Sequence, residues 1–268
     1  MERRASSPVQ HEINQQNERV SRSDAERGRP ALHKQEHAMK KVFPILGLLT
    51  AILLSYALYQ GLVVAPTEQT MGNVQRIFYY HVPSAWTAFL LFFVNFGASV
   101  AYLIKRRPTA DIIALVSAEV GVVFCTVVLV TGPIWARPVW GIWWTWDMRL
   151  TSTLVLWLIY VSYLFLRRFS SSGETPLLAA ALAVLGALCV PFVYFSIWFF
   201  RTQHPQPVMG GGGSIDPRML HALLINWLAF SCFAFLVCWS RYQLETLQRD
   251  VDHAHAMKSL SDPRGNLR

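Results

Sequence analysis

Six apolar segments, each about as long as a helix that crosses a bilayer, constrain this chain more than any other feature of its sequence. A transmembrane helix needs about 20 largely apolar residues to cross about 30 Å of hydrocarbon. We therefore predict an all-α membrane protein with six transmembrane helices. The segments lie at residues 43–64, 82–104, 111–132, 150–166, 176–200 and 219–239.

The composition agrees with this class and excludes several others. The 268 residues are 53% hydrophobic and only 15% charged, a balance that is atypical of a soluble domain. The net charge of +8 does not indicate nucleic-acid binding, because the basic residues flank the apolar segments in short clusters. The four cysteines lie in apolar segments, and neither a C-x-x-C-H motif nor a P-loop motif is present. A c-type cytochrome and a P-loop ATPase are thus excluded.

The distribution of Lys and Arg predicts the orientation in the membrane. With a cytoplasmic N-terminus, 19 of the 24 Lys and Arg residues lie in cytoplasmic segments and five lie in outer ones. Cytoplasmic segments carry the excess of positive charge in membrane proteins. We therefore expect both termini in the cytoplasm and three outer loops, at residues 65–81, 133–149 and 201–218.

Polar segments precede and follow the predicted membrane domain, residues 42–240. Residues 1–41 have too few apolar side chains for a core and are predicted to form a disordered cytoplasmic tail. Met39, directly before Lys40 and Lys41, also fits an alternative start of the protein. Residues 241–268 are predicted to form a second cytoplasmic tail.

Tryptophan is concentrated in the second outer loop. Five of the ten Trp residues fall within residues 135–146. Trp also favours the headgroup region of a bilayer, which is the commoner explanation for any single one. A belt of that kind, however, spreads its aromatic residues over many helix ends. A cluster of indoles is suited to a flat apolar ligand with polar substituents.

Two histidines lie on the same predicted face as this cluster. His81 is at the outer end of the second apolar segment, and His204 follows the fifth. A loop histidine is more often a solvated polar residue, but imidazole is also a common ligand of haem iron. Pro83, Pro205 and Pro207 stiffen the chain beside the two histidines. Their shared face makes them candidate axial ligands.

Charged residues near the cluster allow more than one interpretation. Arg137 and Arg149 could pair with carboxylates of a ligand, although Arg149 could also pair with Asp147 or extend to the membrane interface. Glu119 is a functional candidate because it lies within a span, but a packing hydrogen bond from its protonated form explains it equally well. His221 is interpreted as structural or interfacial.

The segment WGIWWTWDMR, residues 140–149, resembles the WWD signature of haem-handling proteins in cytochrome c biogenesis. Together with six spans and FYYHVP at residues 78–83, it resembles the haem exporter protein C (CcmC) family. The resemblance covers about residues 43–240. The larger relatives that share the signature, CcmF and CcsA, have more spans.

The resemblance implies a site, a cofactor and partners. It implies that His81 and His204 are axial ligands of non-covalent haem b. The part of the loop that holds haem and meets the periplasmic chaperone CcmE is implied to consist of Trp140, Trp143, Trp144, Trp146, Asp147 and Arg149. Further implied partners are the transporter subunits CcmA and CcmB and the small protein CcmD, in the bacterial inner membrane.

The resulting functional hypothesis is a haem chaperone of cytochrome c maturation rather than an enzyme, since no nucleophile and base are evident in the sequence. Two alternatives remain. A b-type electron-transfer subunit would place its haem-ligating histidines within its helices. A haem transporter would carry broken helices or polar groups at mid-membrane, for which Pro191 and Glu119 are the available support.

Overall fold

The computed structural model describes residues 42–170, 173–204 and 215–261. Its contacts divide the chain into two units, Met1–Ala51 and Ile52–Arg268. In the first unit the described residues, 42–51, are helical. The predictions of a disordered N-terminal tail and of stiffening by Pro205 and Pro207 lie outside the described residues.

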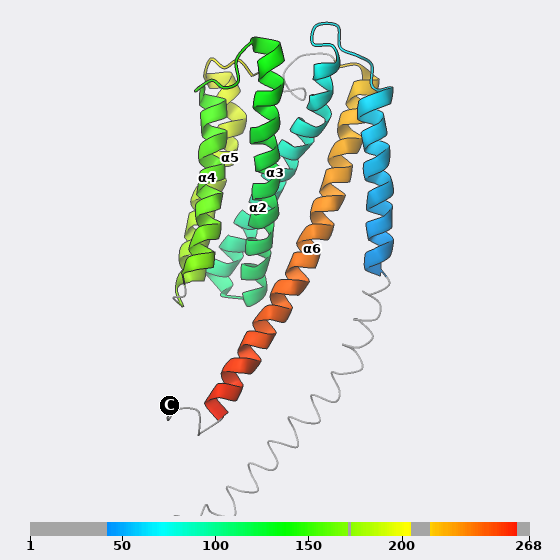
Figure 1. Cartoon of the computed structure of the whole chain (residues 1–268). Helices are drawn as coiled ribbons and strands as arrows, with labels where there is room; N and C mark the ends of the chain where they lie inside the picture. The colour runs from blue at the N-terminus through cyan, green and yellow to red at the C-terminus, as the bar shows by residue number, and fades with distance from the viewer. Residues whose placement is uncertain (1–41, 171–172, 205–214, 262–268) are drawn as a thin grey trace, which may run out of the picture. The chain divides into compact units, whose positions relative to one another are not determined.

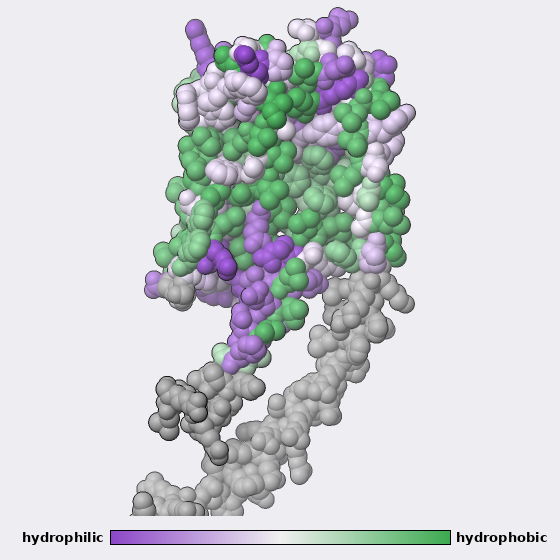
Figure 2. All heavy atoms as spheres, in the orientation of Figure 1, coloured by the Kyte–Doolittle hydropathy of each residue, from purple (hydrophilic) through white to green (hydrophobic). Residues whose placement is uncertain are grey.

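Helices account for nearly all of the described chain, and six of them are long and apolar enough to cross a membrane. The predicted number of spans is thereby confirmed for the part of the chain that the structure describes. On the face seen in Figure 2, hydrophobic residues cover the middle of the helices and hydrophilic residues gather toward their ends. The six spans are Val42–Val64, Asn73–Lys105, Pro108–Trp140, Met148–Phe169, Thr175–Phe199 and Pro217–Met257.

Two of these spans contain a tighter or wider helical turn at one end. The first span ends in a π-helical turn, η1 (Gln60–Val64). The second begins with a 3₁₀ turn, η2 (Asn73–Ile77), and continues as α2 (Phe78–Lys105). Arg76 of η2 donates to the carbonyl of Gly61 at 2.9 Å, which ties the two turns together.

Helix α3 (Pro108–Trp140) extends further than the sequence analysis predicted. The outer loop was expected to begin at residue 133, but Pro133 and Pro138 lie inside the helix. A proline removes one backbone hydrogen bond and does not have to end a helix in a membrane, where neighbouring helices support it. The helix ends at Gly141, whose φ of +76° is the left-handed conformation that favours glycine. The predicted loop 133–149 is therefore corrected to the seven residues 141–147.

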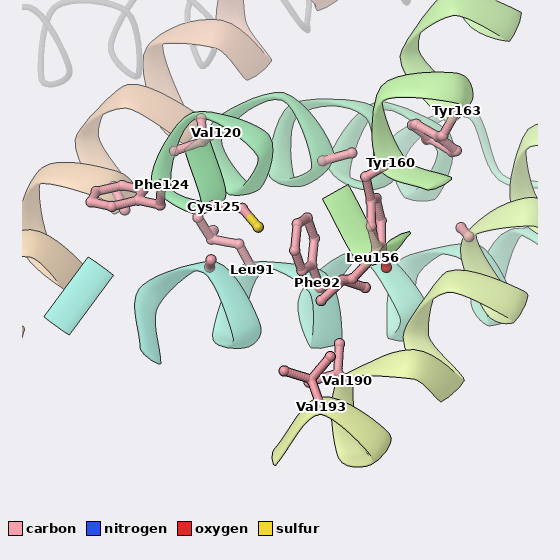
Figure 3. Close-up of a cluster of buried hydrophobic side chains, with 14 of the residues drawn as sticks. Leu91, Phe92, Val120, Phe124, Cys125, Leu156, Tyr160, Tyr163, Val190 and Val193 are labelled. Carbon is pink, nitrogen blue, oxygen red and sulfur yellow. The ribbon is translucent and has the colours of Figure 1, made fainter. Parts of the chain in front are cut away.

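Helices α4 (Met148–Phe169) and α5 (Thr175–Phe199) pack against each other, and α2 packs against α3, α5 and α6. The core between α2 and α4 contains Phe92 and Tyr160, whose rings stack with centroids 3.8 Å apart and an interplanar angle of 11° (Figure 3). A Cβ on Gly121 would lie 2.7 Å from the Phe92 ring, so glycine is required for the close approach of α3. Tight packing of α2, α3 and α4 fixes the framework around the site.

Helix α6 (Pro217–Ser261) continues well past the predicted end of the sixth span at residue 239 and beyond the ends of α3 and α4 (Figure 1). The segment assigned to a C-terminal tail therefore begins as helix. Ion pairs hold this extension. Arg241 donates from Nε and Nη2 to the two carboxylate oxygens of Glu119 at 2.8 and 2.9 Å, and Arg249 donates to Asp111 at 2.8 Å.

The pairing with Arg241 gives Glu119 a partner that the sequence did not reveal. A bidentate guanidinium pair is the interaction of an ionised carboxylate. The protonated packing bond considered from the sequence is thus replaced by an ion pair between α3 and α6.

Candidate functional site

His81 is buried in the first turn of α2, with 7% of its surface exposed. Its Nδ1 lies 2.8 Å from the hydroxyl oxygen of Thr131 on α3. The Trp135 indole meets the imidazole edge-on, with centroids 5.8 Å apart. Helix α3 therefore holds the His81 ring from one side by a hydrogen bond and an aromatic contact.

His204 follows α5 in the chain and lies beside His81. Its imidazole lies close to that of His81, with ring centroids 6.5 Å apart and an interplanar angle of 35°. Its backbone N–H donates to the hydroxyl oxygen of Thr202 at 3.1 Å. Two histidines separated by 123 positions in the sequence thus lie beside each other at one end of the helices.

Both histidines line the same cavity, which is open on one side. Five of the eight residues proposed from the sequence line it, and most of the other lining side chains are apolar. The proposed residues are His81, His204, Trp140, Trp144 and Arg149. The indole N–H of Trp144 is buried and has no hydrogen-bond partner among the described residues. It is a donor that a polar substituent of a ligand could satisfy.

Trp143 and Trp146 do not line the cavity. Their side chains are 59% and 75% exposed, respectively. The Trp146 ring meets that of Trp144 edge-on at 5.7 Å, so this contact connects the exposed part of the loop to the cavity wall. The tryptophans of the motif are thereby divided into a pair that faces the cavity and a pair that faces outward.

Asp147 also lies outside the cavity lining, and its carboxylate organises the loops. One oxygen accepts from the backbone N–H of Leu150 at 2.9 Å and caps the N-terminus of α4. The other accepts from the hydroxyls of Thr145 at 3.1 Å and Thr202 at 2.8 Å. Because Thr202 in turn binds the His204 backbone, Asp147 connects the Trp-rich loop to the segment that carries His204.

Replacing Asp147 with Ala is expected to destabilise the protein by about 1 kcal/mol or more, because a helix cap and two hydroxyl contacts are lost together. Burial raises the pKa of Asp147, but the hydrogen bonds from Leu150, Thr202 and Thr145 outweigh it and lower the pKa below its ordinary value. The carboxylate therefore stabilises the fold above its unfolded pKa of about 3.9, and this stabilisation is lost as the pH falls through the lower folded pKa.

Unfolding in detergent between about pH 7 and pH 3 measures the stability lost in Asp147→Ala and the stability lost as the carboxylate is protonated. Asp147→Asn is the matched control, since it keeps one capping oxygen and should cost less than Asp147→Ala. An Asp147→Ala variant with the stability and pH profile of the unmodified protein would contradict this stabilising role of the Asp147 carboxylate.

The two arginines considered from the sequence have different positions. Arg149 lines the cavity and donates to the backbone carbonyls of Val193 and Tyr194, each at 3.3 Å. No ion pair joins it to Asp147 within the described segments. Arg137 instead donates to the Gly141 carbonyl at the end of its own helix and is exposed. Arg149 is thus the cation available to a ligand in the cavity.

The spacing of the histidines suits one particular type of ligand. Metal–imidazole bonds are about 2 Å long, so two imidazoles on opposite sides of one metal have ring centroids about 6 Å apart. The observed separation of 6.5 Å is close to this value. The described residues contain no group of three or more His, Cys, Asp or Glu placed to hold a bare ion. Two axial imidazoles in an apolar cavity match an iron whose other ligands come from a porphyrin.

Several cavity residues were missed by the sequence analysis because they belong to helices. Gly132 and Trp135 line the cavity from α3, and Phe89 and Thr153 line it from α2 and α4. Thr131 is outside the lining but lies within hydrogen-bond distance of His81. Cavity residues recur along α3 at Cys125, Val128, Gly132 and Ala136, with the spacing of one helical face. This pattern would have been visible if the helix had been extended past Pro133. His221 is exposed near the start of α6 and is not part of the wall.

Comparison with known proteins gives consistent matches. The profile of a protein family described as Heme exporter protein C matches residues 30–257. A Heme exporter protein C of Bradyrhizobium diazoefficiens is 36% identical over 222 residues, covering 82% of this chain and 84% of that protein. That of Escherichia coli is 33% identical, covering 72% and 77%. A putative cytochrome c biosynthesis ccmC-like mitochondrial protein of Marchantia polymorpha is 34% identical, covering 69% and 78%.

Proposed function

The chain belongs to the haem exporter protein C family, and on that premise we propose that it binds haem b non-covalently between His81 and His204 and presents it for cytochrome c maturation. The observation that carries this proposal is the pair of imidazoles that line one apolar cavity with their ring centroids 6.5 Å apart. Haem is the cargo of this site. Imidazoles on both faces of the iron hold it without covalent attachment to the porphyrin.

The cavity wall supports recognition of the rest of the porphyrin. Trp140 and Trp144 supply flat apolar surfaces, and the unpaired Trp144 N–H and the Arg149 guanidinium supply donors for propionates. Burial and apolar neighbours keep water from competing for these donors. The site therefore offers the chemistry that a planar dicarboxylate with a central metal requires.

The exposed half of the Trp-rich loop supports the delivery step. Trp143 and Trp146 are large apolar side chains facing outward, as in the centre of a docking surface. We assign them to contact with the haem chaperone CcmE on the periplasmic side, with CcmA, CcmB and CcmD as the remaining partners. Under this assignment both termini lie in the cytoplasm, as the charge distribution predicts, and the helices lie in the inner membrane of a bacterium.

The protein acts by binding and transfer. Its side chains hold the cargo, leave one edge accessible at the mouth of the cavity and contact the receiving protein, while covalent attachment takes place on the chaperone. None of these steps requires a nucleophile or a general base from this chain, so we propose that it is not itself an enzyme.

Co-purification with CcmE in detergent tests the proposal. The unmodified chain is expected to carry one low-spin haem and to capture CcmE. Replacing both Trp143 and Trp146 with Ala should leave the haem spectrum unchanged and reduce capture by about tenfold or more, since exposed aromatic residues dominate docking energies.

The matched control replaces Trp140 and Trp144, which should instead weaken haem binding. A chain that never carries haem, even when haem is abundant, would overturn the proposed function. Capture that persists without Trp143 and Trp146 would retain haem binding but reject their docking role. If the chain were instead an electron-transfer subunit, it would keep its haem when CcmE is present.

A further inference from the structure

The hydrogen bonds around Thr131 determine which nitrogen of His81 carries a proton. The Thr131 hydroxyl oxygen lies 2.7 Å from the carbonyl oxygen of Val127, one turn earlier in α3, and 2.8 Å from Nδ1 of His81. A hydroxyl has one proton, and a carbonyl oxygen can only accept. The hydroxyl proton is therefore directed to Val127, and the lone pair of the oxygen faces His81.

It follows that Nδ1 of His81 is the donor in its bond to Thr131. A neutral imidazole has one N–H, so the proton on Nδ1 leaves Nε2 with its lone pair. Metals bind this neutral, unprotonated nitrogen. The edge-on contact with Trp135 restricts the orientation of the ring as well.

We propose that Thr131 is a positioning residue that fixes His81 in the Nδ1–H tautomer and thereby makes Nε2 the nitrogen that binds the haem iron. The inference rests on the proposed haem site, and it adds a residue that the Trp-rich motif does not contain. Thr131 acts through His81 and is not itself a ligand. Partners of this kind orient metal-bound histidines and increase their basicity.

The same helix offers a matched control. The Thr126 hydroxyl also donates to the carbonyl one turn earlier, that of Val122, at 2.8 Å. It also accepts from a ring N–H, that of Trp157, at 2.8 Å. Thr126→Val therefore removes the same two types of bond as Thr131→Val, without touching His81. Any effect specific to Thr131→Val arises from the imidazole.

The tautomer can be measured without haem. In the full-length protein labelled with ¹⁵N-histidine and purified haem-free in detergent, the nitrogen shifts of His81 are assigned by comparison with His81→Ala. We expect the Nδ1–H tautomer in the unmodified protein and in Thr126→Val, and a mixture of tautomers in Thr131→Val. An Nε2–H tautomer in the unmodified protein would overturn the inference.

Haem binding provides the second readout. Thr131→Val is expected to weaken ferric haem binding by about tenfold. Replacing a hydrogen-bond partner of a metal-bound histidine costs about 10- to 100-fold in affinity, and a neutral hydroxyl acceptor belongs at the lower end of that range. Thr131→Ser, which keeps the hydroxyl, should restore most of the affinity, and Thr126→Val should bind haem normally. Equal losses in Thr131→Val and Thr126→Val would show a general helix effect and overturn the assignment. If the unmodified chain binds no haem, the proposed function fails, whereas the ¹⁵N spectrum still decides the tautomer.

Discussion

Replacing both His81 and His204 with Ala is expected to abolish specific haem binding. Each single replacement should convert a six-coordinate low-spin spectrum into a five-coordinate high-spin one, because the iron keeps one imidazole and loses the other. The loss of one axial ligand should weaken haem binding by about a hundredfold, equivalent to about 2.7 kcal/mol. Absorption spectra and haem titration of the purified variants measure the ligand number and the affinity.

The control for this experiment is His221→Ala. His221 is an exposed histidine near the start of α6 that does not line the cavity, so its replacement should change neither the spectrum nor the affinity. Low-spin spectra that persist in both single variants would retain haem and reject His81 and His204 as its ligands. A change in His221→Ala equal to that in the other two would indicate a third ligand.

The second large effect is expected at the opposite end of the helices, where Asp111→Ala should destabilise the protein by about 3–5 kcal/mol. The Asp111 side chain is 5% exposed and pairs with Arg167 at 2.6 and 2.8 Å and with Arg249 at 2.8 Å. The Arg167 side chain is itself only 10% exposed. Without Asp111 its charge remains buried and uncompensated. Thermal and denaturant unfolding in detergent measure the loss.

An exposed ion pair serves as the comparison. Asp216 and Arg218 are joined at 3.0 Å, but their side chains are 35% and 66% exposed. Asp216→Ala should therefore destabilise the protein much less than Asp111→Ala, because water screens the pair. If Asp111→Ala and Asp216→Ala had equal, small effects, the buried pairs would not stabilise the attachment of α6.

The sequence predicted the number of helices better than their ends. Apolar length alone reveals a span, because the bilayer fixes how much chain must be apolar. The ends depend on contacts between distant residues. The extension of α6 is held by Arg241 with Glu119 and by Arg249 with Asp111, pairs separated by more than 100 positions. The extension of α3 depends on neighbouring helices tolerating Pro133 and Pro138.

The sequence allowed the prediction of those candidate-site residues whose side-chain type alone indicates metal, ring or carboxylate binding. His81, His204, Trp140, Trp144 and Arg149 were proposed from the sequence, and the structure brings them to one cavity. The assignment of Asp147 to the ligand or its partner stays a prediction, and the structure adds that its oxygens bind the loops. The role of Thr131 was not predictable, because it depends on which atom its hydroxyl proton faces. Local hydrogen-bond direction is a property of the folded chain.

The bridge from Asp147 through Thr202 to His204 has a mechanical consequence. It joins the surface loop that carries Trp143 and Trp146 to the backbone of His204 through a single carboxylate and a single hydroxyl. A protein that binds the exposed tryptophans and displaces the loop also displaces the His204 segment. One linkage would then allow the cargo to be held before docking and released after it, because a shift of the loop displaces the backbone of His204, the proposed iron ligand.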